Sequence, residues 1–294
     1  MLKSEKKIGI IGFGYVGKAM FSFFKDHYET VAYDINPVPI CKKIDSSDKE
    51  VFADYMASKE EIKKCDVAVI CLPTQPLVNG RCDTSLIEDA VDWIESPLII
   101  IKSTVEPETT DRLKKKTGKR ICFSPEFLGE SSYWTPYKFH TDAKETPFFI
   151  FGGDRETTSE CVSLYLPITG PTKSYRQTTA LEAEMAKYIE NTFYATKIAY
   201  CYDMATLCEH IGADWNEVRE LFFKLDPRVS DMHSAVFVDN DKPFGKKCLP
   251  KDILALSSYA ESKGYRPEIL FEVIKSNDRI GAYRKTKRES KGIK

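Results

Sequence analysis

The sequence has no excess of charge of either sign. Its 294 residues include 43 Lys and Arg against 44 Asp and Glu, so it lacks the broad cationic surface that nonspecific binding of nucleic acid requires. It also has no long apolar span, and its N-terminal residues contain no signal-peptide cleavage site. We therefore expect a cytoplasmic protein with small-molecule ligands, bound neither to nucleic acid nor to a membrane.

Metal-binding patterns are also lacking. The nine cysteines are an odd number and form no CxxC pair, and there are no clusters of His and Cys. Neither a complete disulfide framework nor a zinc site is indicated, so we expect no bound metal. Most of the cysteines are expected to be small buried hydrophobic residues.

The first half of the sequence does contain a regular alternation of short apolar runs with segments of helical period. The runs are continuously apolar, which is typical of parallel strands covered on both faces. The predicted fold is therefore α/β, a Rossmann-type doubly wound parallel sheet, followed by a second domain. The six expected strands are residues 8–13, 30–35, 66–72, 97–103, 120–124 and 147–153.

The sequence GFGYVG at 12–17 follows the first predicted strand and opens a helix. In this context the first glycine allows a tight turn, the second the approach of a pyrophosphate, and the third close packing of helix on strand. Asp34 ends the second strand, where a carboxylate accepts hydrogen bonds from ribose and repels a 2′-phosphate, so NAD is favoured over NADP. The alternative is a simple turn with a capping acid. The predicted cofactor residues here are Gly12, Gly14, Tyr15, Val16, Gly17 and Asp34.

Polar residues follow three more of the predicted strands, where ligands of parallel sheets bind. Pro73 and Thr74 follow the third strand, Ser103 and Thr104 the fourth, and Glu126 the fifth. Hydroxyl residues are also common in ordinary turns and caps. A carboxylate in an apolar neighbourhood has a desolvation cost that a partner must offset, which makes Glu126 a stronger candidate.

The second half is predicted to be helical. A long helix from about 179 to 211 is closed by Gly212, and its apolar residues cover more than one stripe, which favours a dimer interface. Further helices are expected at 214–225, 250–263 and 266–276. The predicted domains are an NAD-binding domain at 1–177, a helical core and dimerisation domain at 178–283, and a basic, flexible tail at 284–294.

Lys187 and Asn191 lie four residues apart on the long helix and so share a face. Taken alone, this is an ordinary solvent-facing pair. Cys248 stands just before Pro250, a good first-turn residue, so this thiol is expected at a helix N-terminus, where the dipole favours thiolate. Asp252 is four residues further along and faces the same way.

Together these segments resemble the UDP-glucose/GDP-mannose dehydrogenase family, and most of all its UDP-glucose 6-dehydrogenases. The resemblance covers almost the whole chain, and SPEFL with CLPKD is more specific than any glycine motif. The matching motifs are GFGYVG at 12–17, STVEPETT at 103–110, SPEFLGES at 124–131, EAEMAKYIENTFYATKIA at 182–199, DPRV at 226–229 and GKKCLPKD at 245–252.

The resemblance implies oxidation of a sugar C6 alcohol to a carboxylate with two NAD molecules in succession. It makes Cys248 the nucleophile of a thiohemiacetal and thioester, with Asp252 in proton transfer. It also implies that Lys187 and Asn191 stabilise oxyanions, and that Glu126 is the acid/base for a water. Thr104 would position that water. The implied binding residues also include Glu130 for the cofactor, and Phe127, Leu128, Lys187, Asn191, Arg228, Phe244 and Gly245 for the nucleotide sugar, with UDP-glucose as the expected substrate and a homodimer as the expected assembly.

Two departures from the family pattern bear on this expectation. Lys246 stands where the family has a second glycine before the cysteine segment, so it alters the fit of the sugar or supplies a phosphate contact. The sequence also ends without the family's third, nucleotide-binding domain, and the basic residues from 284 to 294 are either a partial substitute or a disordered terminus.

Two other functions remain open. A β-hydroxyacid dehydrogenase shares the two-domain length and a Lys/Asn pair on a long helix, but needs no cysteine. A non-catalytic NAD-binding or assembly module would bind NAD without turnover, yet it leaves the full set of candidate catalytic residues unexplained.

Overall fold

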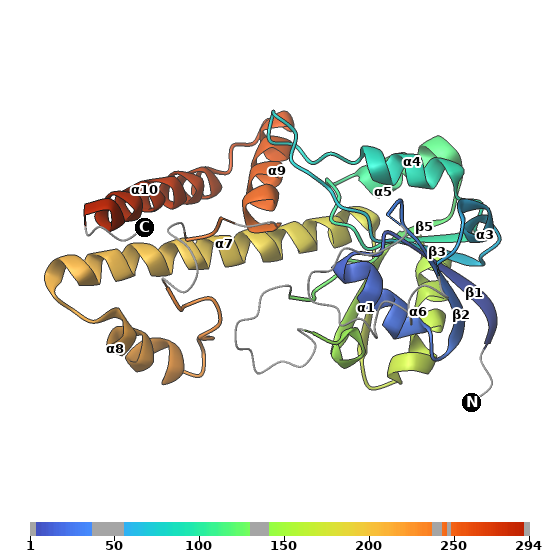
Figure 1. Cartoon of the computed structure of the whole chain (residues 1–294), viewed down its shortest axis with the longest axis horizontal. Coiled ribbons are helices and arrows are strands. Elements are labelled where there is room, and N and C mark those ends of the chain that lie inside the picture. The colour runs from blue at the N-terminus through green and yellow to red at the C-terminus, as the bar shows by residue number, and fades with distance from the viewer. Residues whose placement is uncertain (1–3, 37–55, 130–140, 237–242, 246–247, 291–294) are drawn as a thin grey trace. The chain divides into compact units, whose positions relative to one another are not determined.

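The structure is a computed structural model that describes residues 4–36, 56–129, 141–236, 243–245 and 248–290 (Figure 1). It divides into two compact units. Unit 1 comprises Met1–Gln75 and Asp83–Lys187, and unit 2 comprises Pro76–Cys82 and Tyr188–Lys294. The change from strands to helices thus falls near the predicted boundary at 177, although the long helix begins in unit 1 and a short segment at 76–82 belongs to unit 2.

Unit 1 contains a seven-stranded sheet with the order β2-β1-β3-β4-β5-β6-β7. The strands are β1 (Ser4–Ile11), β2 (Tyr28–Tyr33), β3 (Val67–Ile70), β4 (Leu98–Ile101), β5 (Ile121–Phe123), β6 (Phe148–Gly152) and β7 (Ser174–Thr178). The neighbouring strands β2, β1, β3, β4 and β5 are all parallel to one another. Ile8 of β1 lies opposite Thr30 of β2 on one side and Val67 of β3 on the other. The predicted doubly wound sheet is confirmed, and the six predicted strands correspond to β1–β6.

The sheet differs from the prediction in two ways. Strand β6 is antiparallel to β5, with Phe123 opposite Gly152, and it pairs in parallel with β7, which was not predicted. A parallel connection needs a long crossover, usually a helix. Among the described residues between β5 and β6, the helical element is the single turn η2 (Ala143–Glu145), so the return strand runs the other way. Strand β7 is the polar edge sequence SYRQT, which carries no apolar run.

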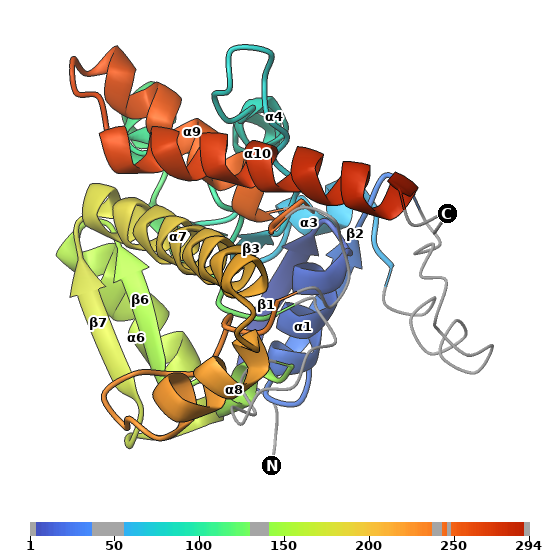
Figure 2. The same ribbon diagram turned by 90° about the vertical axis from the view of Figure 1, so that its left-hand side faces the viewer.

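Helices cover both faces of the sheet (Figures 1 and 2). They are α1 (Tyr15–Phe24), α3 (Lys59–Lys63), α4 (Ser85–Trp93), α5 (Thr109–Thr117) and α6 (Arg155–Thr169). Strand β4 shows how one run supplies two cores. Leu98 and Ile100 point into the cluster beneath α1 and α6, whereas Ile99 and Ile101 point into the cluster beneath α4 and α5. Continuous apolarity is therefore required by burial on both faces.

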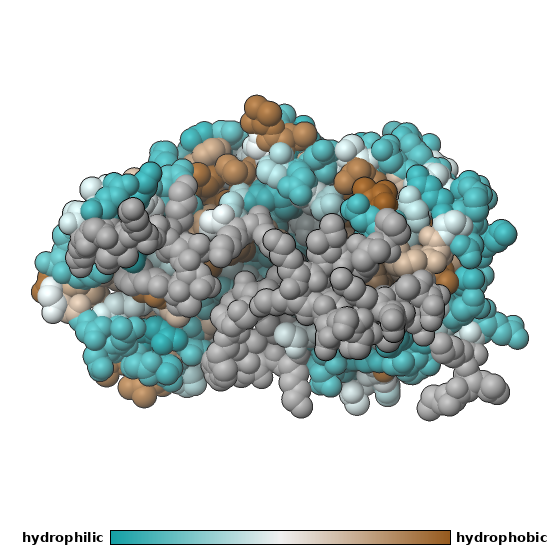
Figure 3. Space-filling model, viewed as in Figure 1, coloured by the Kyte–Doolittle hydropathy of each residue, from teal (hydrophilic) through white to brown (hydrophobic). Residues whose placement is uncertain are grey.

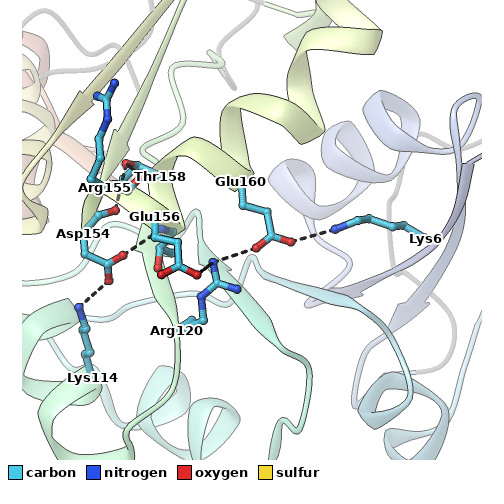
Figure 4. A network of polar contacts seen from close by, with 9 residues as sticks. Lys6, Lys114, Arg120, Asp154, Arg155, Glu156, Thr158 and Glu160 are labelled. Atoms are coloured by element: carbon cyan, nitrogen blue, oxygen red, sulfur yellow. Dashed lines mark hydrogen bonds and ion pairs between the residues drawn. The ribbon is translucent and has the colours of Figure 1, made fainter.

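An ion network ties α6 to the strands at the edge where β1 and β5 begin (Figure 4). Glu160 pairs with Lys6 at 2.8 Å and with Arg120 at 2.9 Å. Asp154 caps α6 and pairs with Lys114 at 2.6 Å, and that hydrogen bond holds the pKa of Asp154 well below its usual range. Because these side chains are partly exposed, each pair adds little stability, but the network orients α6.

Unit 2 is helical. Its elements are most of α7 (Ala180–Ile211), then α8 (Trp215–Arg219), the π-helical turn η3 (Glu220–Lys224), α9 (Cys248–Ser262) and α10 (Glu268–Ser290). Gly212 follows α7 with φ of 79°, as expected of a helix-ending glycine. Helix α10 is much longer than the predicted 266–276 and runs through residues 284–290 of the segment that was expected to be a flexible tail.

Two apolar clusters hold unit 2 together. Ala195 and Ala199 of α7 pack with Ile253 of α9 and Val273 of α10. Further along α7, small side chains pack with Trp215 of α8 and with η3. The coloured residues on the face seen in Figure 3 are mostly hydrophilic, with apolar residues in small groups. Within the described part of the chain, no helix is both long and apolar enough to cross a membrane.

Candidate active site

The glycine motif forms the turn between β1 and α1. Gly12 has φ of 87°, and a Cβ there would lie 2.7 Å from the carbonyl oxygen of Cys71. A Cβ on Gly17 would overlap the carbonyl oxygen of Gly12. Around Gly14, in contrast, a Cβ would meet nothing within 4 Å, and this residue is the N-cap of α1 with no side-chain cap. The turn therefore leaves an open approach to the amides of the helix N-terminus, as a pyrophosphate requires.

Asp34 lies directly after β2, beside the glycine turn. Its Oδ2 accepts a hydrogen bond from the Phe13 amide at 2.7 Å, and its Oδ1 accepts one from the Asn36 amide at 2.9 Å. These bonds fix the carboxylate and leave it further lone pairs for ribose hydroxyls. The turn and this acid fit NAD: Gly14 and the amides of α1, including those of Tyr15 and Val16, would hold the pyrophosphate, and Asp34 would hold the ribose.

The polar residues after β3 and β4 are brought together. Thr74 donates from Oγ1 to the carbonyl of Thr104 at 2.9 Å, next to the exposed Pro73. Ser103 is buried, and its Oγ donates to the carbonyl of Ile70 at 3.5 Å. The three hydroxyl residues thus join the ends of two neighbouring strands, at the edge of the sheet that the glycine turn occupies.

A buried carboxylate supports the loop after β4. Glu184 of α7 is 0% exposed and accepts hydrogen bonds from the amides of Glu108 and Thr110, at 2.7 and 2.9 Å, and from the Thr110 hydroxyl at 2.6 Å. Glu108 has φ of 76°, a left-handed conformation that is strained for a non-glycine residue. Glu184 therefore caps α5 and stabilises the turn in STVEPETT, while burial raises the pKa of its carboxyl to about 7.

Glu126 lies just after β5 and is mostly buried. Its Oε1 accepts hydrogen bonds from the amides of Phe127 and Leu128, at 2.8 and 3.1 Å. Its Oε2 lies 3.5 Å from the ammonium of Lys102, a residue that is 4% exposed. The prediction that a partner must offset the desolvation of Glu126 is thus supported by a buried lysine that the sequence analysis did not select.

Lys187 reaches the same part of unit 1. Its ammonium lies 4.8 Å from the ring centroid of Phe127, a cation–π contact. The Tyr15 hydroxyl donates to the carbonyl of Gly129 at 2.6 Å and so links the start of α1 to the SPEFLG segment. Leu128 packs against the core beneath α1 and α6. Glu130 lies outside the described residues.

In unit 2, Asp252 and Asn191 form a buried pair. Asn191 donates from Nδ2 to Asp252 Oδ2 at 2.6 Å, and Lys251 Nζ lies 2.6 Å from Asp252 Oδ1. Asp252 is 0% exposed. Cys248 is exposed and is the first residue of α9, one turn before Asp252. The helix starts two residues earlier than the predicted 250, so Cys248 is its first residue and does not precede it. Asn191 and Asp252 meet as a hydrogen-bonded pair.

The other predicted sugar-binding residues are also in unit 2. Phe244 is buried and its amide donates to Asn277 Oδ1 at 3.0 Å, while Gly245 is exposed. Arg228 is an exposed residue whose guanidinium forms a two-point contact with Asp226. Lys246 lies outside the described residues.

Three side chains at the site were missed by the sequence analysis: Lys102, Glu184 and Lys251. The first two carried a usable signal, because each is a charged residue directly beside or within an apolar run, in PLIIIK and LEAEMA. A charge at such a position is seldom buried without a partner. The partners could not be identified, since they lie far away in the sequence.

Comparison with known proteins agrees with this geometry. The UDP-glucose/GDP-mannose dehydrogenase family matches through its NAD binding domain at residues 42–168 and through its central domain at residues 181–279. The chain is 33% identical to a UDP-glucose 6-dehydrogenase of Rickettsia bellii over 230 residues, 74% of this chain and 50% of that protein. It thus spans about half the length of that curated relative.

Solved structures show the same arrangement of elements. A UDP-glucose dehydrogenase of the archaeon Pyrobaculum islandicum is similar with a TM-score of 0.79 and 25% identity, over 94% of this chain and 69% of that one. A 3-hydroxyisobutyrate dehydrogenase of Mycobacterium tuberculosis is similar with a TM-score of 0.67 at 14% identity, over 97% of this chain and all of that one, which shows a shared fold alone. With both family domains matched in order over most of its length, this chain belongs to the UDP-glucose/GDP-mannose dehydrogenase family, and its N-terminal unit is the NAD-binding domain.

Proposed function

We propose that this chain acts in the NAD-dependent oxidation of the C6 alcohol of a nucleotide sugar to a carboxylate, with UDP-glucose as the substrate. The observation that supports this most is the α9 segment. Cys248 begins the helix, and Asp252 is buried one turn later on the hydrogen bond from Asn191. A dehydrogenase that only forms a ketone or an aldehyde needs no nucleophile at such a position.

The proposed chemistry passes through a covalent intermediate on Cys248. Bound NAD accepts a hydride in each of the two oxidations. The thiolate sulfur adds to the C6 aldehyde to give a thiohemiacetal, and the second oxidation turns this into a thioester. Water then adds to the thioester carbonyl, the C–S bond breaks, the thiolate leaves, and the two protons of the water are released as the sugar carboxylate forms.

The roles of the surrounding residues follow from their chemical types. The ammonium of Lys187 and the amide of Asn191 stabilise the oxyanions of the two tetrahedral species. Glu126 takes a proton from the water, and Thr104 positions that water. Asp252 holds Asn191 in place and exchanges a proton with the Cys248 thiol through a water. The N-terminus of α9 favours the thiolate of Cys248.

Binding of the sugar nucleotide is proposed for Phe127 and Leu128 in unit 1 and for Arg228, Phe244 and Gly245 in unit 2. We also propose a homodimer in the cytoplasm. Exposed apolar side chains recur along one side of α7, at spacings of four and seven residues that place them on one helical stripe. They are Ile189, Phe193, Tyr200, Leu207 and Ile211.

The stoichiometry of NADH tests this function. Purified protein supplied with UDP-glucose is expected to form two NADH per sugar, and Cys248→Ser is expected to abolish the complete reaction. Cys208→Ser, which replaces a buried cysteine in the core near α8, is the matched control and retains activity. A yield of one NADH per sugar, or full activity in Cys248→Ser, contradicts the thioester mechanism.

The same assay separates the alternatives. Turnover of small β-hydroxyacids that survives Cys248→Ala would identify a β-hydroxyacid dehydrogenase. Binding of NAD without turnover of UDP-glucose, GDP-mannose or a UDP-N-acetyl sugar would identify a non-catalytic module.

A further inference from the structure

Lys102 is a buried lysine at the edge of the sheet where the candidate site lies. It is the first residue after β4, whose four residues are all Leu or Ile, and it is 4% exposed. Its ammonium reaches across to the segment after β5. It lies 3.4 Å from Ser124 Oγ, 3.2 Å from the Pro125 carbonyl and 3.5 Å from Glu126 Oε2. All three contacts are to one short stretch of chain.

Glu126 is held from two sides. Two backbone amides donate to Oε1, and the ammonium of Lys102 lies next to Oε2. These contacts fix the position of both carboxylate oxygens. The amides also limit the rotation of the side chain, so the second oxygen is left with Lys102 as its neighbour.

Three further titratable groups that interact with the pair are neutral. Burial raises the pKa of the Cys71 thiol, the Cys122 thiol and the Tyr165 hydroxyl well above their usual values. The electrostatic field of Lys102 or Glu126 acts on each of them. A second cation, Lys187, lies over the Phe127 ring. The charged group in direct contact with Glu126 is therefore Lys102.

A purely structural role does not account for a charge at this position. Burying an ion pair has a desolvation cost that its Coulomb attraction barely offsets, and apolar residues of similar size in its place are often neutral or stabilising. Met or Leu would continue the apolar run of β4. The charge of Lys102 is therefore a candidate for a role other than stability.

We propose that Lys102 is a positioning residue for Glu126, holding its carboxylate oriented to accept a proton from the water that hydrolyses the thioester. This rests on the proposed function, because it assigns Lys102 to the hydrolytic half of that reaction. In this proposal Lys102 acts through Glu126, whose Oε2 lies 3.5 Å from its ammonium.

The kinetic test compares Lys102→Met with wild type. Loss of the ammonium removes the group that orients Glu126 Oε2, so hydrolysis of the thioester is expected to be about tenfold slower while the first oxidation keeps its rate. A burst of NADH should precede slow turnover, and mass spectrometry should detect the thioester on Cys248. The matched control is Lys119→Met, which removes a lysine that caps α4 by donating to the carbonyls of Val91, Asp92 and Ile94.

Equal rates of thioester hydrolysis in wild type and Lys102→Met, or an equal NADH burst in Lys119→Met, would overturn the proposal. The distinction matters because Lys119→Met loses stability without touching Glu126. A uniform loss of rate at every pH, with no burst, would show a structural role alone and would also overturn it.

A second measurement does not depend on turnover. Urea midpoints are compared for wild type, Lys102→Met, Glu126→Gln and the double variant. Glu126→Gln leaves a buried ammonium without its carboxylate, so it is expected to be the least stable, and Lys102→Met on that background should raise the midpoint. If the midpoint change in the double variant equals the sum of the changes in the two single variants, the two residues are not coupled, which would contradict the proposal. If wild type fails to oxidise any nucleotide sugar while the midpoints remain coupled, the proposed function fails and the ion pair stands.

Discussion

The glycines of the GxGxxG turn meet two different requirements, the close packing of helix on strand and the approach of a ligand. Gly17 is needed for packing, because a Cβ there would overlap the carbonyl of Gly12. Gly14 is not needed for packing, because its surroundings are open and its φ of −76° suits any residue. The openness at Gly14 is instead what a ligand needs.

Alanine substitutions should therefore separate stability from NAD affinity. Gly17→Ala is expected to lower the free energy of unfolding by about 1–3 kcal/mol, because overpacking outweighs the better helix propensity of Ala. Gly14→Ala is expected to leave that free energy within about 1 kcal/mol of wild type and to weaken NAD binding at least ~10-fold, since the methyl group occupies the pyrophosphate approach. Urea denaturation and NAD titration measure the two quantities. Equal effects of the two substitutions on stability would refute the distinction.

At the scale of elements, one carboxylate connects α7 to α5. Glu184 satisfies the amides at the start of α5, where Glu108 adopts its left-handed conformation. Three residues further along α7, Lys187 contacts Phe127. The first turns of α7 thus contact both polar loops of the site in unit 1.

The free energy of unfolding should depend on pH because Glu184 titrates at a different pH in the folded and unfolded states. Its pKa is about 7 in the folded protein, raised by burial from an ordinary value of 4.5. Between pH 4.5 and pH 7 the carboxyl of Glu184 is ionised in the unfolded chain but still protonated in the folded protein. The rising pH therefore favours the unfolded chain, so the contribution of Glu184 to the free energy of unfolding is fully present below pH 4.5 and is lost as the pH rises through 7. The loss amounts to about 3 kcal/mol.

Urea denaturation at pH 5 and pH 8 checks this prediction. Wild type is expected to lose more stability over that interval than Glu184→Gln, by about 2.5 kcal/mol. Glu182→Gln is the control on the same helix, because hydrogen bonding by Thr178 lowers the pKa of Glu182. The same pH dependence in wild type and Glu184→Gln would contradict the assignment.

At the scale of the whole molecule, the apolar stripe of α7 is the feature that a dimer would explain. Phe193 is 61% exposed and Ile211 is 69% exposed. A helix with this much exposed apolar surface is typical of an interface between subunits. The stripe begins at Ile189, five residues after Glu184, and continues to Ile211 at the C-terminus of α7.

Charge placed on the stripe should weaken a dimer. Phe193→Glu combined with Leu207→Glu is expected to yield monomers in sedimentation or size-exclusion experiments at micromolar concentration, because two buried carboxylates per subunit would lack partners. The control is Glu209→Gln, an exposed change on the same helix. A monomeric wild type, or a dimer that both glutamates leave intact, argues against this interface.

Much of the molecule was predictable because its determinants are local. The apolar runs of β1 to β6, the glycine turn, the long helix ending at Gly212 and the helix start near Cys248 each depend on residues close together in sequence. Asp34 could be placed because its distance from the glycines is set by one strand–helix–strand unit.

The tertiary structure decided what depends on distant partners. Strand β7 carries no apolar pattern because it is an edge strand, and the direction of β6 follows from its pairing with β5 and β7. The pairing of Lys102 with Glu126, and of Glu184 with the start of α5, arises where separate strands and helices converge. The sequence by itself determined the NAD fold, since this follows from short-range geometry, and its resemblance to the family singled out Cys248 as the candidate nucleophile. Which charges are buried together was decided by tertiary packing, because desolvation and Coulomb energy depend on neighbours that only the folded chain brings within reach.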